Sequence, residues 1–374
     1  MKVIIIGSAH PLRGGLAAYN ERLAKAFIDD GDDVTIYSFS LQYPGFLFPG
    51  KSQFTDEPAP KNLKIKTCIN SINPFNWIKI GNEIKRLKPD LVICKFWLPF
   101  MGPCFGTILR KIKKNKHTKI ISIIDNIIPH EKRFGDRAFA NYFIKPVDGF
   151  IAMSKSVLKD LETFTKTKQK VFSPHPLYDH FGENIPKEQA KKNLGLDINT
   201  NYLLFFGFIR DYKGLDWLIE AFADERFRKM NLKLIVAGEF YADAKPYHDL
   251  IAKHKLENEI ILRTDFIPDS KVGDYFCAAD IVVQPYKDAT QSGVTQIGYH
   301  FKKPMLVTNV GGLGEIIPNG KVGYVVSPNP KAIADAMFDF YENKKEAEFI
   351  SFAKEEKKKY SWEIMIDEVK KLMK

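Results

Sequence analysis

The first half of the chain alternates short apolar runs with stretches of helical periodicity. Residues 3–6 form an apolar run, and residues 16–27 then repeat apolar side chains at the three- to four-residue spacing of a helix, which Gly31 closes. These runs are apolar on both faces, which is typical of parallel strands covered by helices. Strands are expected at residues 3–6, 34–39, 91–94, 120–124 and 149–153.

The second half repeats this alternation of strands and helices. A helix is expected at residues 215–222, and strands at 202–207, 232–238, 260–263, 281–284, 305–308 and 324–326. Two successive arrays of this kind predict an α/β protein with two doubly wound, Rossmann-like parallel sheets. Because open sheets of this type bind ligands beyond the carboxyl ends of their strands, we expect two domains that face a cleft, with functional residues in the loops after the strands.

A segment rich in Pro and Gly at residues 173–186 breaks the pattern and marks the domain boundary. We therefore expect an N-terminal domain of residues 1–176 and a C-terminal domain of residues 177–374. The final helix, residues 361–374, could pack back on the N-terminal domain.

Composition narrows the class of protein. The chain has 374 residues with 45% hydrophobic and 27% charged side chains, which is ordinary for a globular protein. It lacks an apolar run of ~18 residues, so a membrane-spanning helix is not expected. Its four cysteines have no metal-site spacing, which favours a reducing cytoplasm and argues against a zinc or disulfide scaffold.

The net charge of +11 suits an anionic partner. The densest basic block, Arg110–Lys119, contains no aromatic residue, which weakens the case for single-stranded nucleic acid. No helix-turn-helix, zinc or RNP motif is present, so a nucleic-acid-binding module is not expected. An anionic membrane surface and a solvated lysine-rich face both remain open for this block.

Two loops carry residues suited to anions. Gly14 and Gly15 follow the first strand and open a helix, where backbone amides can approach a phosphate, although a plain loop is the alternative. The spacing is not G-x-G-x-x-G, which argues against a dinucleotide-dependent dehydrogenase. Arg210 and Lys213 follow the first strand of the second half and offer a planar fork and a point charge to phosphate oxygens.

A third loop, residues 286–295, ends where a helix is expected to begin. Its small and hydroxyl residues can present amides to an anion. The candidates are Gln291, Ser292, Gly293, Val294 and Thr295. A fourth loop, residues 310–315, is rich in glycine and also follows a strand, so four such loops converge on strand ends.

The order and spacing of these motifs resemble the retaining glycosyltransferases of family 4, which have the GT-B fold. The segments that carry the resemblance are residues 13–15, 207–214, 236–238, 278–285, 303–304, 308–315, 320–326 and 360–362, with 38–44 and 48–51 similar to a bacterial subgroup. The resemblance implies that the C-terminal domain binds a nucleotide-diphosphate sugar. The N-terminal domain would receive the acceptor.

The resemblance also assigns residue roles. Arg210 and Lys213 would hold the diphosphate, assisted by the amides near Ser292 and Gly293, and Ile267 would lie near the nucleobase. Gly14 and Gly15 would close on the diphosphate from the other domain. Cationic donors of this kind stabilise a leaving diphosphate without metal, so neither a metal nor a separate cofactor is expected.

Two departures from the family pattern stand out. The family commonly carries two glutamates eight positions apart, and those positions are Ala289 and Ile297 here; a slip of one residue would pair Asp288 with Gln296. The family also often has a histidine after the strand that ends near residue 124. Here Asp125 or His130 would take that role.

Both substitutes have plainer interpretations. Asp125 could instead cap an Asx-turn, and His130 could be a loop histidine bonded to Glu131.

The expected protein is therefore a cytoplasmic, retaining, metal-independent hexosyltransferase. It would act on a glycan or lipid-linked acceptor in cell-envelope polysaccharide or glycolipid synthesis, with a possible peripheral association with the inner face of the membrane. The alternatives are a catalytically inactive GT-B homologue that serves as a partner subunit, and a GT-B epimerase or phosphorylase.

Overall fold

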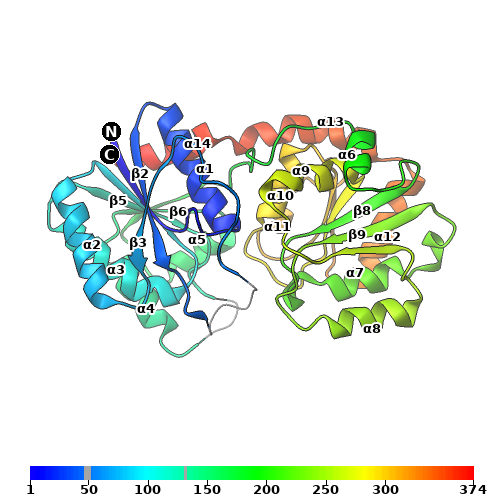
Figure 1. Ribbon diagram of the computed structural model, residues 1–374, viewed down its shortest axis with the longest axis horizontal. Coiled ribbons are helices and arrows are strands. Elements are labelled where there is room, and N and C mark those ends of the chain that lie inside the picture. The colour runs from blue at the N-terminus through cyan, green and yellow to red at the C-terminus, as the bar shows by residue number, and fades with distance from the viewer. Residues whose placement is uncertain (46–51, 130–132) are drawn as a thin grey trace. The chain divides into compact units, whose positions relative to one another are not determined.

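The computed structural model describes residues 1–45, 52–129 and 133–374. The chain forms two compact units: Met1–Pro176 with Ser361–Lys374 (unit 1), and Leu177–Tyr360 (unit 2). Both units are parallel α/β sheets covered by helices (Figure 1). The predicted fold class is confirmed, and each unit is described separately below.

Unit 1 holds a seven-stranded sheet in the order β3-β2-β1-β4-β5-β6-β7, and every pairing is parallel. Its strands are β1 (Lys2–Ile6), β2 (Asp33–Leu41), β3 (Lys64–Asn70), β4 (Leu91–Phe96), β5 (Lys119–Ile124), β6 (Gly149–Ala152) and β7 (Gln169–Phe172). Its helices are α1 (Gly15–Asp29), α2 (Pro74–Leu87), α3 (Gly102–Lys113), α4 (Asp136–Ile144), α5 (Lys155–Glu162) and α14 (Trp362–Lys371), with a short 3-10 helix at Pro99–Met101.

The strands of unit 1 alternate their side chains between two helical layers. Ile4, Val92 and Cys94 join a core cluster with residues of α2, α3 and α4 on one face. The helix α1 covers the opposite face, where α14 packs beside it and Lys370 pairs with Asp30 and Asp32. The C-terminal helix is thus part of unit 1, and the two chain ends lie near each other (Figure 1).

Unit 2 holds a six-stranded sheet in the order β10-β9-β8-β11-β12-β13, again wholly parallel. Its strands are β8 (Asn201–Phe206), β9 (Leu232–Ala237), β10 (Ile260–Arg263), β11 (Ile281–Gln284), β12 (Met305–Thr308) and β13 (Gly323–Val326). Its helices are α6 (Lys187–Asn193), α7 (Leu215–Phe222), α8 (Lys245–His254), α9 (Asp269–Ala278), α10 (Gly293–His300), α11 (Leu313–Ile316), α12 (Pro330–Glu342) and α13 (Glu346–Glu356), with 3-10 turns at Asp211–Lys213 (η3), Glu225–Phe227 (η4) and Lys357–Tyr360 (η5).

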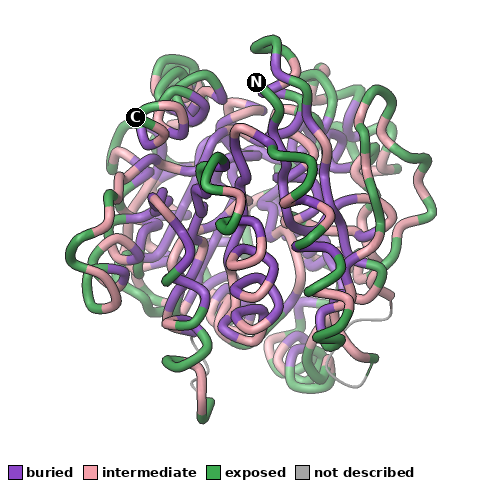
Figure 2. The backbone as a smooth tube through the Cα atoms, turned by 90° about the vertical axis from the view of Figure 1, so that its left-hand side faces the viewer, coloured by how far each residue is buried: buried purple, intermediate pink, exposed green. Residues whose placement is uncertain are grey.

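Burial follows this layered plan. Figure 2 shows the strands as largely buried and the outer helix faces as exposed. The strand order reverses beside β1 in unit 1 and beside β8 in unit 2, and loops that leave the carboxyl ends of strands at such points are where open sheets bind ligands. The candidate residues that the structure describes lie in loops that leave the carboxyl ends of strands, or in the helices that these loops open.

Candidate functional site

The loop after β8 brings two cations to the carboxyl edge of the sheet in unit 2. Arg210 is exposed, and its guanidinium lies 5.2 Å from the ring centroid of Tyr241. Lys213 is half-buried, and its ammonium lies 5.6 Å from the ring centroid of Tyr286. Burial, with the nearby charge of Arg210, lowers the pKa of Lys213 to about 7. A negative charge placed beside this lysine would favour its charged form and raise its pKa again.

Two glycines lie close to this lysine and its turn. A Cβ on Gly207 would stand 3.0 Å from Lys213 Nζ. Gly214 has a φ of +67°, and a Cβ there would stand 2.0 Å from the carbonyl oxygen of Pro285. The turn η3 is therefore locked against the segment that follows β11.

Lys287 also holds the turn η3 against the segment that follows β11. Its ammonium lies 2.8 Å from carboxylate oxygens of both Asp211 and Asp216. Its backbone N–H also donates to the carbonyl of Tyr212 at 2.7 Å.

The N-terminus of α10 lies in the loop predicted to assist the diphosphate. The first amides of a helix have no intrahelical acceptor, and no side chain caps α10, because the hydroxyl of Ser292 lies 3.3 Å from that of Tyr286. These amides belong to Gly293, Val294 and Thr295. The helix dipole adds partial positive charge at the same place.

The side chains of this loop contribute differently. Thr295 is fully buried, and its hydroxyl donates to Gln284 Oε1 at 3.2 Å, so the helix offers the backbone of Thr295 rather than its hydroxyl. Gln291 is half-buried. Gly293 leaves room for a ring, since a Cβ there would stand 2.6 Å from Tyr178 Cε2.

The positions of the usual glutamates are closed to a ligand. Ala289 and Ile297 are each only 5% exposed. Asp288 is exposed whereas Gln296 is fully buried, so the alternative pair occupies two different environments.

An aromatic row that the sequence analysis did not find follows β8, β9 and β10. Phe208 stacks on Tyr241 with centroids 4.2 Å apart, and Phe266 stacks on Phe208 at 6.5 Å. All three rings are half-buried, and Ile267, predicted to lie near a nucleobase, follows Phe266 directly. The sequence pattern does not indicate these rings, because they lie in three separate loops.

Unit 1 presents a second set of polar groups, again at the carboxyl edge of its sheet. Gly14, with a φ of +94°, precedes α1, and no side chain caps this helix, which begins at Gly15. Asp125 follows β5 directly, and its backbone N–H donates to the carbonyl of Phe96 at 2.9 Å. His130 lies outside the described residues, as does the stretch 48–51.

Asp125 has a buried partner that the sequence analysis missed. The ammonium of Lys95, in β4, lies 2.8 Å from Asp125 Oδ1; the side chain of Lys95 is 3% exposed and that of Asp125 is 16% exposed. The indication in the sequence was a lysine inside an otherwise apolar strand, which the predicted strand stopped short of. An ion pair gives Asp125 a fixed orientation that an Asx-turn alone does not require.

Metal-binding groups are not prominent in either unit. Among the described residues, no cluster of three or more His, Cys, Asp or Glu side chains could hold a metal ion. Within the same residues, no helix is long and apolar enough to cross a membrane.

Comparison with known proteins gives the family. Residues 13–173 match the family described as Glycosyltransferase Family 4, and residues 200–343 match Glycosyl transferases group 1. The chain belongs to the family 4, or group 1, glycosyltransferases. It is therefore a glycosyltransferase of the class that uses nucleotide-diphosphate sugars, and the resemblance drawn from its motifs is confirmed.

Relatives of this glycosyltransferase cover either the whole chain or part of it. An uncharacterized glycosyltransferase of Methanocaldococcus jannaschii is 26% identical over 376 residues, covering 100% of this chain and 97% of the relative. The lipopolysaccharide 1,2-N-acetylglucosaminetransferase of Salmonella typhimurium is 26% identical over 206 residues, 50% of this chain and 52% of the relative.

Solved structures share the fold at low identity. Sucrose-phosphate synthase of Thermosynechococcus elongatus has a TM-score of 0.75 at 14% identity, covering 99% of this chain and 98% of that one. Anabaena HepE in complex with UDP and glucose has a TM-score of 0.72 at 15% identity, with the same coverage. The GT-B fold is confirmed by these likenesses.

Proposed function

We propose that this glycosyltransferase transfers a hexosyl group, with retention and without a metal ion, to a glycan or lipid-linked acceptor in the synthesis of cell-envelope polysaccharide or glycolipid. Unit 2 would bind the nucleotide-diphosphate sugar, and unit 1 would bind the acceptor and supply Asp125. The observation that carries the proposal is the convergence of Arg210, Lys213 and the N-terminus of α10 at one edge of one sheet. Charge-assisted donors aimed at a leaving diphosphate lower the barrier to its departure.

The donor site would bind the diphosphate by charge and the nucleobase by stacking. Arg210, Lys213 and the first amides of α10 suit the diphosphate oxygens. The aromatic row offers a nucleobase a face on which to stack, worth ~1–3 kcal/mol per base, and Ile267 would pack at its edge. Tyr241 contacts both sets, since its ring stacks on Phe208 and lies beneath Arg210.

Asp125 would act on the transferred sugar. An ionised carboxylate at the carboxyl edge of the sheet can orient a sugar hydroxyl and stabilise positive charge that develops at the anomeric carbon. Gly14 and Gly15 would bring uncapped amides of α1 to the diphosphate. The role of His130 stays a prediction, because it lies outside the described residues.

The apolar Ala289 and Ile297 support a second candidate, an inactive homologue that binds donor without turnover. In the active enzyme, the polar neighbours Gln291 and Ser292 would replace the contacts that glutamates make in other members. Transfer distinguishes the two candidates, because only the active enzyme moves the glycosyl group to an acceptor hydroxyl, or slowly to water, and so releases nucleotide.

A panel of UDP-, ADP- and GDP-sugars, screened by thermal shift and then by nucleotide release, tests the proposal. A ligand at 100 times its Kd adds ~2.7 kcal/mol of stability, which is readily seen. Asp125→Asn keeps any turn cap but removes the charge, so we expect nucleotide release to fall ~100-fold with nearly unchanged melting temperature. Near-normal release in Asp125→Asn would leave only the turn role for this residue. Stabilisation of the wild-type protein without release would favour the inactive homologue.

We also propose that unit 1 contacts an anionic membrane surface. The basic block begins in α3, but Arg110 is tied to the carbonyls of Gly106 and Tyr142, and Lys113 pairs with Asp148. Lys114 is exposed.

The neighbouring helix α2 extends this surface with apolar groups. At its N-terminal end Phe75 is 84% and Ile78 is 38% exposed, beside the exposed Lys79. The two helices lie close, since a Cβ on Gly81 would stand 2.7 Å from Lys111 Cβ. Exposed apolar groups next to lysines suit the boundary of an anionic bilayer, where each basic residue contributes ~1 kcal/mol.

A further inference from the structure

Lys95 is a cation buried inside a parallel sheet. Lysine is almost never fully buried unless it is paired, because removing an ammonium from water is costly. Lys95 is only 2% exposed, and the partner that compensates its charge is Asp125, 2.8 Å away. Burial outweighs the attraction of that carboxylate and lowers the pKa of Lys95. The protein thus keeps a lysine, whose burial is unfavourable, in contact with the residue proposed to face the sugar.

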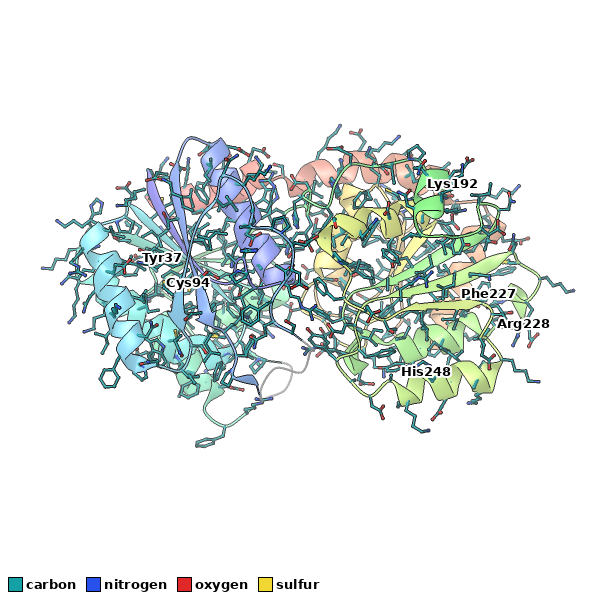
Figure 3. The ribbon with its side chains drawn as sticks, in the orientation of Figure 1. Tyr37, Cys94, Lys192, Phe227, Arg228 and His248 are labelled. Atoms are coloured by element: carbon teal, nitrogen blue, oxygen red, sulfur yellow. The ribbon has the colours of Figure 1, made fainter. Side chains whose placement is uncertain are left out.

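The direction of the Lys95 side chain follows from the alternation of β4. Cys94, labelled in Figure 3, and Phe96 both join the core cluster that α2 and α3 cover. Successive side chains of a strand point to opposite faces, so Lys95 points to the face that α1 covers. There its ammonium lies 3.4 Å from the ring centroid of Tyr19, a residue of α1. The ring face and the carboxylate together hold the ammonium in one place.

Tyr19 also packs against two residues of unit 1, one near each point where the chain crosses between the units. The ring of His175 lies 5.0 Å from that of Tyr19, and the ring of Trp362 lies 5.2 Å from it. His175 precedes the last residue of the first segment of unit 1, and Trp362 is the second residue after the chain returns to unit 1. The two chain passages are thus anchored on the tyrosine that faces Lys95.

His175 adds no charge to this cluster. Burial and the nearby charge of Lys95 lower its pKa to about 3, so it is neutral at physiological pH. Its Nδ1 lies 2.6 Å from the carbonyl oxygen of Pro176, which fixes Nδ1 as the protonated nitrogen. Lys95 therefore interacts with Asp125 next to a neutral imidazole rather than a second cation.

We propose that Lys95 is a positioning residue for Asp125, and that the packing of Tyr19 on His175 and Trp362 couples the placement of this carboxylate to the two chain passages between the units. The inference rests on the proposed function, because it takes Asp125 as the group that acts on the sugar. Lys95 itself touches no substrate. It holds the carboxylate in one orientation, so its loss acts on turnover rather than on donor binding.

Nucleotide release by Lys95→Met, Asp125→Asn and the double variant tests whether Lys95 positions Asp125. The substrate is the nucleotide sugar of the panel that gives the largest thermal shift. We expect Lys95→Met to lower kcat ~10–100-fold, as misplacement of a reacting group does, with the donor KM within about twofold of wild type. The double variant should be no slower than Asp125→Asn alone, since residues that act as a unit are not additive.

Lys168→Met is the matched control. Lys168 is a half-buried lysine of unit 1 whose ammonium donates to the carbonyls of Ile144, Lys145 and Val147. Its loss should lower the melting temperature but leave kcat unchanged. If Lys95→Met fails to fold, Tyr19→Leu carries the test, because it removes the supporting ring and leaves the ion pair. It should then lower kcat with an unchanged donor KM.

The outcomes separate this inference from the proposed function. A normal kcat in Lys95→Met, or in Tyr19→Leu where that variant carries the test, overturns the positioning role if Asp125→Asn is impaired. Losses that multiply in the double variant also overturn it. A normal kcat in Asp125→Asn instead overturns the role proposed for Asp125, and the positioning inference falls with it.

Discussion

Gly214 approaches Pro285 so closely that a Cβ on the glycine would stand 2.0 Å from the proline carbonyl oxygen. Gly195 has the same φ of +67°, but nothing lies within 4 Å of its added Cβ. The left-handed conformation costs an alanine roughly 1–2 kcal/mol, so we expect Gly195→Ala to lower the free energy of unfolding by that amount only. Gly214→Ala should cost more and should also weaken nucleotide binding, because the clash displaces the turn that holds Lys213. Denaturant unfolding and UDP titration measure both, and equal losses in the two variants would contradict the close approach.

The depressed pKa of Lys213 predicts a pH dependence of donor binding. The free lysine has a pKa of about 7, and the phosphates of a bound donor would raise it. Below pH 7 the ammonium is charged before and after binding. Above pH 7 binding must take up a proton, so the Kd should rise up to about tenfold per pH unit until the pKa of the bound state is reached.

Calorimetry with UDP-glucose between pH 6 and pH 9, in buffers of different ionisation enthalpy, measures this proton uptake. Lys213→Met should bind more weakly at neutral pH and should lose the uptake. Uptake that persists in Lys213→Met would assign the proton to another group.

Gly293→Val should abolish turnover. The added side chain would collide with the ring of Tyr178 and crowd the first amides of α10, where the diphosphate is proposed to bind. Gly320→Val is the control, because a Cβ added at this glycine of unit 2 meets nothing within 4 Å. Nucleotide release and melting temperature report on the two variants, and a folded Gly293→Val protein with full activity would remove this loop from the site.

Binding to anionic vesicles should depend on α2 as well as on α3. We expect cosedimentation to weaken when Lys111, Lys113, Lys114 and Lys116 are neutralised, and to weaken separately in Phe75→Ser. Phe352→Ser is the matched control, because Phe352 is 41% exposed in unit 2. Binding that survives both changes on unit 1 would place the membrane contact elsewhere, and salt should screen the lysine part alone.

The fold was largely predictable because each central strand is buried on both faces. The central strands at 281–284 and 305–308 agree with the predicted ranges, and so does the edge strand at 260–263. The prediction missed β3 and β7, which lie at the two edges of the sheet in unit 1. These two strands mix polar and apolar residues, as in Lys64–Asn70, so they show no continuous apolar run.

The candidate site was predictable only where the sequence itself is unusual. Glycines and cations at strand ends stand out, which is how Arg210, Lys213 and Gly293 were found. The ion pair between Lys95 and Asp125 joins residues 30 positions apart, and their proximity depends on the pairing of β4 with β5. The aromatic row likewise exists only after three separate strands become neighbours.

The most direct test of the account is the affinity of UDP, ADP and GDP for the wild-type protein, Arg210→Ala and Lys213→Ala, measured by calorimetry. Arg226→Ala is the control, because this arginine pairs with Asp224 and Asp335 in unit 2. At least one nucleotide should bind the wild-type and control proteins equally well. Charge-assisted bonds to phosphate are worth roughly 1.5–3 kcal/mol each, so Arg210→Ala and Lys213→Ala should each bind it ~10–100-fold more weakly. Wild-type affinity in both variants, or no binding of any nucleotide to the wild-type protein, would contradict the proposed donor site.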